Sequence, residues 1–304
     1  MIRLSIVIAT YNRAPILARS LRSLREQTLE HRLWEIVVVD NNSTDDTQAV
    51  AAGFAAENPI INLRIVAEPQ QGLSYARNCG IAAAAGDLIV MIDDDIEADG
   101  NFARAYLDFF DEHPDVAAAG GRIVPLYDTP PPHWLSKYTE QPISGTTYLG
   151  SSVAPCPRGR TPNGGNMGFR RAAVERHGGF DTMLGRKGSA PLAGEEREFF
   201  RRMRLGGEKI YYIPGALIHH VVPASRFTDE YFDRVTRGVG VSEHIRTRSL
   251  SSWAYFVRTA VETVKWGATL LLAAGFALRG EAIKGRYLIR LRCNISKGLT
   301  GCGQ

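Results

Sequence analysis

Apolar runs alternate with helix-like segments over the first 95 residues of the chain. The runs at 4–9, 34–39, 63–66 and 88–92 are rich in β-branched residues, a composition typical of strands buried on both faces. Strands that alternate with helices form mostly parallel sheets with right-handed crossovers. Ligands of such sheets lie outside the carboxyl ends of the strands. The alternation therefore predicts an α/β fold and the sheet edge at which a site should lie.

The segments between the runs have the signals of helices. Apolar residues recur at helical spacing over 16–24. Ser43 and Asp46 form a capping-box pattern that predicts a helix ending near residue 57. The alanine-rich stretch 74–85 predicts a third helix, stopped by Gly86.

Polar residues follow three of the runs at the point where each predicted strand ends. The first run enters Thr-Tyr-Asn-Arg at 10–13, the second enters Asp-Asn-Asn-Ser at 40–43, and the fourth enters three aspartates at 93–95. One such exit is an ordinary turn, but three indicate a polar site at one edge. Neither GxGxxG nor GxxxxGK[ST] follows the first run, which argues against a dinucleotide dehydrogenase or a P-loop NTPase.

The three aspartates suggest a metal. If strand geometry continues through them, Asp93 and Asp95 share a face and Asp94 points away. Two carboxylates on one face suit Mg²⁺ or Mn²⁺, which also bind substrate phosphate oxygens and water. The sequence thus predicts a metal-dependent enzyme that acts on a phosphorylated substrate, with an acidic solvated loop as the alternative.

Composition and charge limit the possible partners and surroundings. The 304 residues, 44% apolar, suffice for one large α/β domain with appendages or for two modest domains. Residues 246–304 contain ten Lys or Arg against two Glu, whereas the rest of the chain is net acidic, which argues against a nucleic-acid partner. The four cysteines lack CxxC spacing and the chain begins on a strand-like run, so we expect no zinc site and a cytoplasmic protein.

Four segments together resemble a known enzyme family. They are SIVIATYNR at 5–13, EIVVVDNNSTDDT at 35–47, GLSYARNCGIAAAAGDLIVMIDDD at 72–95 and GEEREFFRRM at 194–203. Their order and spacing are similar to those of family 2 glycosyltransferases, which have the GT-A fold, invert the anomeric centre and contain a DxD motif. The resemblance covers about residues 1–225 and implies a nucleotide-diphosphate-sugar donor, most often a uridine one.

The resemblance also assigns residues to the donor. Eight residues would lie near the nucleotide or its sugar: Thr10, Tyr11, Arg13, Asp40, Arg77, Asn78, Asp93 and Asp94. Asp40 would accept a hydrogen bond from the base, and an acceptor-only carboxylate does suit the imide N–H of uracil. Arg77 suits a diphosphate, and a structural salt bridge is the alternative.

The metal is assigned in the same way. Asp93 and Asp95 would form the DxD pair that holds Mg²⁺ or Mn²⁺, with Asp95 the more direct ligand. His220, three residues before Pro223, would complete the metal shell or contact the diphosphate. A histidine bonded to a backbone carbonyl is the alternative.

Glu195 and Glu196 begin a predicted helix where the family usually has Glu-Asp, with the second acid as catalytic base. Glu196 would therefore take the proton of an acceptor hydroxyl, and Glu195 is the next candidate. The helix dipole lowers the basicity of an acid in the first turn, and partial burial or the neighbouring carboxylate would counter that effect. A sugar-phosphate nucleotidylyltransferase should show a GxGTRL-like loop after the first strand, and a non-catalytic sugar-nucleotide-binding protein would lack the base. Both remain alternatives.

The second half of the chain is assigned to the acceptor and to a membrane. Residues 1–120 would form the nucleotide-sugar half, 121–225 the acceptor half with a mobile loop at 181–193, and 226–304 a helical basic extension. The uncharged run 266–278 would reach about 20 Å as a helix, too short to span roughly 30 Å of hydrocarbon. With the basic residues after it, the run suits an anionic membrane surface at the inner face of the cell membrane, or a helix packed on the catalytic domain. The absence of a QxxRW pattern favours addition of a single sugar to a glycan or lipid-linked acceptor in cell-surface polysaccharide synthesis.

Overall fold

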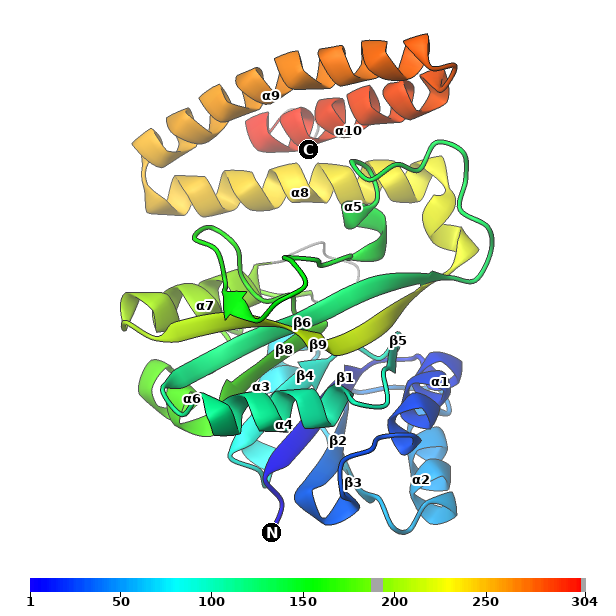
Figure 1. Ribbon diagram of the computed structural model, residues 1–304, viewed down its shortest axis with the longest axis vertical. Helices are drawn as coiled ribbons and strands as arrows, with labels where there is room; N and C mark the ends of the chain where they lie inside the picture. Colours follow the sequence, from blue (N-terminus) through cyan, green and yellow to red (C-terminus); the bar gives the residue numbers. More distant parts are fainter. Residues whose placement is uncertain (187–193, 302–304) are drawn as a thin grey trace. The chain divides into compact units, whose positions relative to one another are not determined.

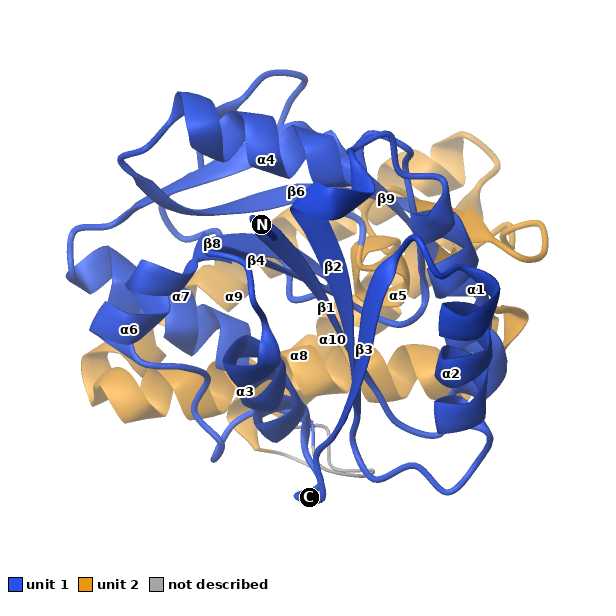
Figure 2. Ribbon diagram, turned by 90° about the horizontal axis from the view of Figure 1, so that it is seen from below, with its two compact units in different colours: residues 1–124, 146–220 blue, residues 125–145, 221–304 orange. Residues whose placement is uncertain are grey.

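The computed structural model describes residues 1–186 and 194–301, and its chain divides into two compact units (Figure 1, Figure 2). The first unit comprises residues 1–124 and 146–220, and the second comprises 125–145 and 221–304. The strands are β1 (Leu4–Thr10), β2 (Trp34–Asp40), β3 (Asn62–Ala67), β4 (Leu88–Ile92), β5 (Ile96–Ala98), β6 (Val116–Tyr127), β7 (Ala154–Pro155), β8 (Asn166–Arg170) and β9 (Lys209–Val222). The helices of the first unit are α1 (Ala14–Arg25), η1 (His31–Leu33), α2 (Thr47–Glu57), α3 (Leu73–Ala83), α4 (Phe102–Glu112), α6 (Arg171–His177) and α7 (Glu195–Leu205).

One mixed sheet runs through the first unit. Its strand order is β3-β2-β1-β4-β8-β6-β9-β5, and β7 pairs with β9. The four N-terminal strands are parallel, as predicted, and Thr10 pairs with Asp40 where β1 and β2 end. β8 is antiparallel to β4, and β5 is antiparallel to β9. The pairing of Ile96 with His220 brings the end of β9 beside the segment that follows β4. The predicted α/β class is therefore confirmed.

Helices cover both faces of this sheet (Figure 2). Side chains alternate along β1, so that Ile6 and Ile8 join an apolar cluster with α1, α2 and α4, while Val7 joins another with α3, α6 and α7. The two-sided burial explains the continuous apolar runs in the sequence. The expectation of burial on both faces is wrong for β3, which lies at the sheet edge and is largely exposed.

Two helix ends differ from those predicted. α2 begins at Thr47 and not at Ser43, because Ser43 is held in the preceding loop, where its backbone N–H donates to Asp40 and its hydroxyl accepts from Asn12 N. α3 ends at Ala83, before Gly86. A Cβ on Gly86 would lie 2.8 Å from the backbone of Arg3, so this glycine permits a close chain approach and does not cap the helix.

The second unit is helical and has its own apolar core. It contains α5 (Gln141–Ser144), η2 (Ala224–Phe227), α8 (Asp229–Leu250), α9 (Ser252–Leu278) and α10 (Ala282–Thr300). Trp134 stacks on Tyr287 with ring centroids 4.3 Å apart and meets Phe232 edge to face. The proline-rich segment that the sequence assigned to the acceptor half thus packs among these helices. The second unit combines this segment, residues 125–145, with residues 221–304.

The apolar run at 266–278 is the end of a longer helix than expected. α9 has 27 residues, about 40 Å by helix geometry, and among the described residues it is the one helix long and apolar enough to cross a membrane. The run at 266–278, too short to span by itself, is therefore only the C-terminal half of this helix. Only 17% of its apolar window is buried.

Candidate active site

The aspartate triplet lies in a turn between β4 and β5, not on a strand. β4 ends at Ile92, so the alternation predicted for Asp93 and Asp95 does not hold. Asp94 and Asp95 are buried, at 5% and 7% exposure, while the side chain of Asp93 is 46% exposed. Asp94 and Asp95 both face the guanidinium group of Arg13, whereas Asp93 faces that of Arg77.

Arg13 holds the two buried aspartates. Its Nη1 lies 2.8 Å from Oδ1 of Asp94 and 3.2 Å from Oδ2 of Asp95. The Thr10 hydroxyl donates to Oδ2 of Asp94 at 2.7 Å. Burial raises the pKa of Asp94 to about 6 against the opposing charge of Arg13, and the charge of Asp95 adds to the increase. Thr10 and Arg13 therefore lie at the predicted edge, but here they orient the triplet.

Asp95 and His220 form the part of the edge that suits a metal. Oδ1 of Asp95 lies 3.3 Å from Nε2 of His220, and both side chains are largely buried. Within residues 1–186 and 194–301, no group of three His, Cys, Asp or Glu side chains forms a metal cage. A carboxylate beside an imidazole fits a cation such as Mn²⁺ that completes its shell with water and substrate phosphate oxygens.

Arg77 connects the triplet to the helix that begins with the two glutamates. On α3, its Nη1 donates to Oε1 of Glu195 at 2.7 Å, and its Nη2 lies 3.8 Å from Oδ1 of Asp93. The guanidinium also lies over the Phe180 ring, 5.4 Å from its centroid. Arg77 and Glu195 are both buried, so this ion pair fixes the start of α7 relative to the sheet edge.

Glu196 has the electrostatics of a general base. It lies in the first turn of α7, which begins at Glu195 as the sequence predicted. Burial, and after it the charge of Glu195, raise the pKa of Glu196 to about 7 against the opposing charge of Arg77. Both effects invoked against the helix dipole, burial and a neighbouring acid, are thus present. A pKa near 7 suits proton abstraction at neutral pH.

Asp40 and Asn41 shape the loops at the neighbouring strand end. Asp40 accepts from Ser43 N at 3.0 Å and from the Gln48 amide at 2.6 Å, which leaves capacity because a carboxylate accepts about four hydrogen bonds. The Asn41 amide donates to the carbonyls of Glu68 and Gln70. Its oxygen accepts from the backbone N–H of Gly72, the residue before α3. The roles of Gln48 and Asn41 were missed, since a sequence pattern does not show which loops they join.

Asn78 and Tyr11 differ sharply in their surroundings. The amide of Asn78 donates to the carbonyl of Phe180 and accepts from its N–H, both at 2.8 Å, so it fixes the loop that carries Phe180. Tyr11 is 42% exposed beside Asn12, whose φ is +51°. Of the loop predicted at 181–193, residues 187–193 lie outside the described residues.

Asn166 is a buried polar residue that the sequence analysis did not single out. Its amide donates to the carbonyls of Arg122 and Ala216 and accepts from the Tyr106 hydroxyl. A Cβ on Gly121 would lie 2.3 Å from this amide and 2.1 Å from the Ala216 oxygen, so that glycine is required for the packing. The network fixes the strands beneath the acidic edge.

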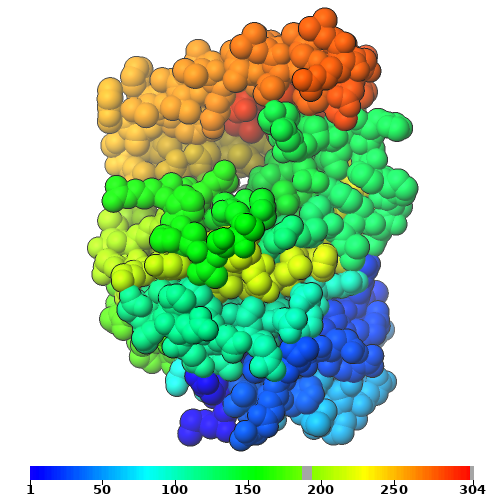
Figure 3. All heavy atoms as spheres, in the orientation of Figure 1, coloured from blue at the N-terminus to red at the C-terminus, as the bar shows by residue number. Residues whose placement is uncertain are grey.

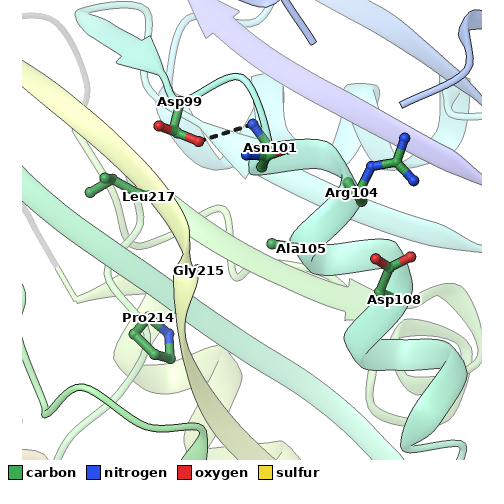
Figure 4. A pocket seen from close by; sticks show the side chains of 8 residues that line it. All are labelled: Asp99, Asn101, Arg104, Ala105, Asp108, Pro214, Gly215 and Leu217. Carbon is green, nitrogen blue, oxygen red and sulfur yellow. Dashed lines mark hydrogen bonds between the residues drawn. The ribbon is translucent and has the colours of Figure 1, made fainter. Parts of the chain in front are cut away.

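A separate hollow of about 420 Å³ lies between α4 and β9 (Figure 4). Asp99 and Asp108 line it together with Arg104, which donates to the Thr28 carbonyl. None of the predicted site residues lines this hollow.

Comparison with known proteins shows which enzyme family the chain belongs to. A family description, "Glycosyl transferase family 2", matches residues 5–178, which include the aspartate triplet and Arg77. The chain belongs to glycosyl transferase family 2. It is accordingly a glycosyltransferase, as the sequence motifs indicated.

Relatives in this family include two of similar length. The succinoglycan biosynthesis protein ExoM of Rhizobium meliloti is 29% identical over 307 residues, covering 99% of this chain and 94% of the relative. The glucosyl-dolichyl phosphate glucuronosyltransferase of Haloferax volcanii is 26% identical over 229 residues, covering 72% of this chain and 69% of the relative.

Solved structures show the GT-A fold. The mannosyltransferase PcManGT from Pyrobaculum calidifontis, in complex with GDP-Man and Mn²⁺, matches with a TM-score of 0.60 and 19% identity, covering 99% of this chain and 88% of that one. S. aureus TarS 1–349 in complex with UDP-GlcNAc matches with a TM-score of 0.57 and 16% identity, covering 99% and 92%. The predicted GT-A fold is therefore confirmed.

Proposed function

We propose that this family 2 enzyme transfers a single sugar from a nucleotide-diphosphate sugar, a UDP-sugar in the first instance, to a hydroxyl group, with inversion at the anomeric carbon. The supporting observation is the excess of acid at the edge, where five carboxyl groups interact with three guanidinium groups among the described residues. The carboxyl groups are those of Asp93, Asp94, Asp95, Glu195 and Glu196, and the guanidinium groups those of Arg13, Arg77 and Arg197. Carboxylates in excess at a largely buried edge favour a cation or a proton, and a donor with its metal supplies the first.

The donor binds across the strand ends. Asp40 accepts a hydrogen bond from the base, Thr10 and Tyr11 border the nucleotide, and Asn78 supports the sugar pocket through the Phe180 loop. Arg77, which lies between Asp93 and Glu195, stabilises the negative charge that the departing diphosphate gains.

The metal is Mg²⁺ or Mn²⁺. Asp95 and His220 would hold it, with Asp93 as a further carboxylate of the same triplet. When bound, such an ion neutralises charge on the diphosphate as it leaves. Solved GT-A structures described with Mn²⁺, the mannosyltransferase PcManGT and GalNAc-T7, support this choice.

Glu196 acts as the base in a single displacement. Its carboxylate takes the proton of the acceptor hydroxyl, and that oxygen forms a bond to the anomeric carbon. The bond from that carbon to the diphosphate oxygen breaks at the same time, and the electron pair leaves with the diphosphate. An α-linked donor gives a β-linked product. Glu195, already paired with Arg77, holds the start of α7 in position.

The acceptor is a glycan or a lipid-linked glycan, in cell-surface polysaccharide synthesis at the cytoplasmic face of the membrane. The names of the relatives support this, because they include a succinoglycan biosynthesis protein, a glucosyl-dolichyl phosphate glucuronosyltransferase and a GalNAc(5)-diNAcBac-PP-undecaprenol β-1,3-glucosyltransferase.

Incubation with a panel of nucleotide sugars and Mn²⁺ tests the proposal through the phosphate product. We expect release of nucleoside diphosphate from one donor, stimulated by an acceptor glycan. Formation of a nucleotide sugar from a nucleoside triphosphate and a sugar phosphate would instead identify a nucleotidylyltransferase. Donor binding without any product would indicate a binding protein.

A further inference from the structure

The outer face of α9 has the polarity that a helix surface in lipid requires. Exposed large apolar residues recur along it from one end to the other: Trp253, Phe256, Val257, Val261, Val264, Leu270, Leu271, Leu272 and Leu278. The buried residues of α9 are polar, namely Glu262 and Thr269. A helix that packs on a protein in water normally buries its apolar stripe, so this arrangement is the reverse of the ordinary one. In Figure 3, the atoms of α9 are seen at the surface in orange.

Polar contacts fasten the inner face of α9 to α8 and α10. Glu262 accepts from Arg258 on its own helix at 2.8 Å and from Arg292 on α10 at 2.9 Å. Arg258 also donates to Glu243 on α8. The Trp266 indole donates to Ser296 at 3.0 Å. Because these contacts fix which side of α9 faces the unit, the apolar side stays exposed.

The segment that contains α9 has exposed charges of one sign. In the described part of 246–304, the exposed charged side chains are all basic: Arg246, Arg248, Lys265, Arg279, Arg286 and Lys297. Of the acids there, Glu262 is buried between arginines and Glu281 pairs with Lys284. The face therefore complements an anionic lipid surface, whereas two copies meeting through it would bring like charges together.

We propose that the outer face of α9 docks the protein on an anionic membrane, with the helix lying in the plane of the interface. Trp253 and Arg279, at the two ends of the helix, suit the headgroup level. Crossing the bilayer would place the Glu262 ion pairs in hydrocarbon, so the helix lies flat and does not span. This inference names the surface through which the protein would reach the membrane of the proposed function. Its biological role rests on that proposed function, but its experimental test does not.

Vesicle sedimentation of the full-length protein without substrate provides that test. The wild type should bind vesicles of phosphatidylcholine with one third phosphatidylglycerol. The double variant Val264→Ser/Leu271→Ser should bind at least about tenfold more weakly, because two of the most exposed apolar side chains lose their contact with lipid.

The matched control removes two equally exposed apolar residues from the first unit. Ile60→Ser/Leu205→Ser, at 68% and 74% exposure against 76% and 77%, should bind within about twofold of the wild type. Equal thermal unfolding of both double variants would show that folding is intact. Tryptophan emission should shift to the blue on anionic vesicles, and Trp253→Phe should remove most of that shift.

Equal vesicle binding by the wild type and Val264→Ser/Leu271→Ser would overturn the proposal. So would a wild-type dimer in light scattering that the same variant converts to a monomer, since the face would then bind a second copy. Release of nucleoside diphosphate with a soluble acceptor is measured separately. Sugar transfer without vesicle binding contradicts this inference alone, and vesicle binding without transfer contradicts the proposed function alone.

Discussion

Each of the two compact units buries charged residues. Carboxyl groups outnumber arginines at the sheet edge of the first unit, whereas arginines outnumber the carboxylate around Glu262 in the second. At the sheet edge of the first unit, five carboxyl groups interact with three arginines, Asp93 stays half exposed, and the pKa of Glu196 rises to about 7. In the second unit, Glu262 is enclosed by Arg258 and Arg292. Burial alone would raise the pKa of Glu262, but the hydrogen bonds from the two arginines outweigh it and lower the pKa.

The difference distinguishes a site from a structural ion-pair network. Carboxylates that the chain itself does not neutralise have capacity left for a cation, a proton or a substrate. A carboxylate already enclosed by arginines has none, and it fixes how helices pack. Perturbed pKa values occur in both places, so the direction of the shift is the more useful guide here. Four predictions test this comparison.

The largest effect is expected for Glu196→Gln. The amide cannot accept the proton of the acceptor hydroxyl, so kcat should fall by about 10²- to 10⁴-fold while donor affinity in calorimetry stays within a few-fold. Glu198→Gln is the matched control on the same helix, since Glu198 pairs with Arg202 and should change kcat little. Normal turnover in Glu196→Gln would assign the base elsewhere, with Glu195 first.

Glu262→Gln should lower stability without touching the chemistry. The substitution leaves two buried guanidinium groups short of a counter-charge, and we expect a loss of about 2–4 kcal/mol in urea unfolding. Glu281→Gln makes the same change at a more exposed pair and should cost less than about 1 kcal/mol. If both variants are equally stable, the enclosed network does not have the structural role assigned to it.

The pH profile of the wild type should reflect the raised pKa of Glu196. The base acts only when it is deprotonated, so kcat/KM should rise about tenfold per pH unit up to the pKa and level off above about 7. Rates under saturating metal and donor give the profile. If kcat/KM instead levels off near pH 4.5, the ordinary pKa of glutamate, burial does not raise the pKa of Glu196.

The smallest effect is expected for Asp111→Asn, which removes an exposed ion pair of the first unit. Arg3 and Asp111 are about half exposed, so the unfolding free energy should change by less than about 1 kcal/mol, with activity unaltered. A loss comparable to that of Glu262→Gln would show that burial does not separate strong from weak pairs in this protein.

The first half of the sheet could be predicted from the sequence because its strands are buried on both faces. The apolar runs match β1, β2 and β4 to within a residue. β3 matched in position but not in burial, since a short apolar run does not show that a strand lies at an edge. The start of α2 was predicted too early, because Ser43 accepts a hydrogen bond from Asn12, a contact that no local pattern shows.

Several of the residues that the sequence assigned to the site do lie together, but their pairings could not be predicted. The residue types at the strand ends and at the start of α7 indicated the chemistry, yet the pairings of Arg13 with Asp94 and of Arg77 with Glu195 join segments far apart in the chain. The length of α9 was underestimated for a related reason. Its charged residues face α8 and α10, so an uncharged run marks only part of the helix.

The central claim is that the acids of the sheet edge, which outnumber its arginines among the described residues, bind a donor through a divalent cation. Calorimetry of UDP and GDP with the wild type and Asp95→Asn, with Mn²⁺ or with a chelator, measures this directly. One nucleotide should bind the wild type at least about tenfold more tightly with Mn²⁺, and Asp95→Asn should lose that gain while its thermal unfolding shows a folded protein. Equal affinity with and without Mn²⁺, or a full metal effect in Asp95→Asn, would contradict the account.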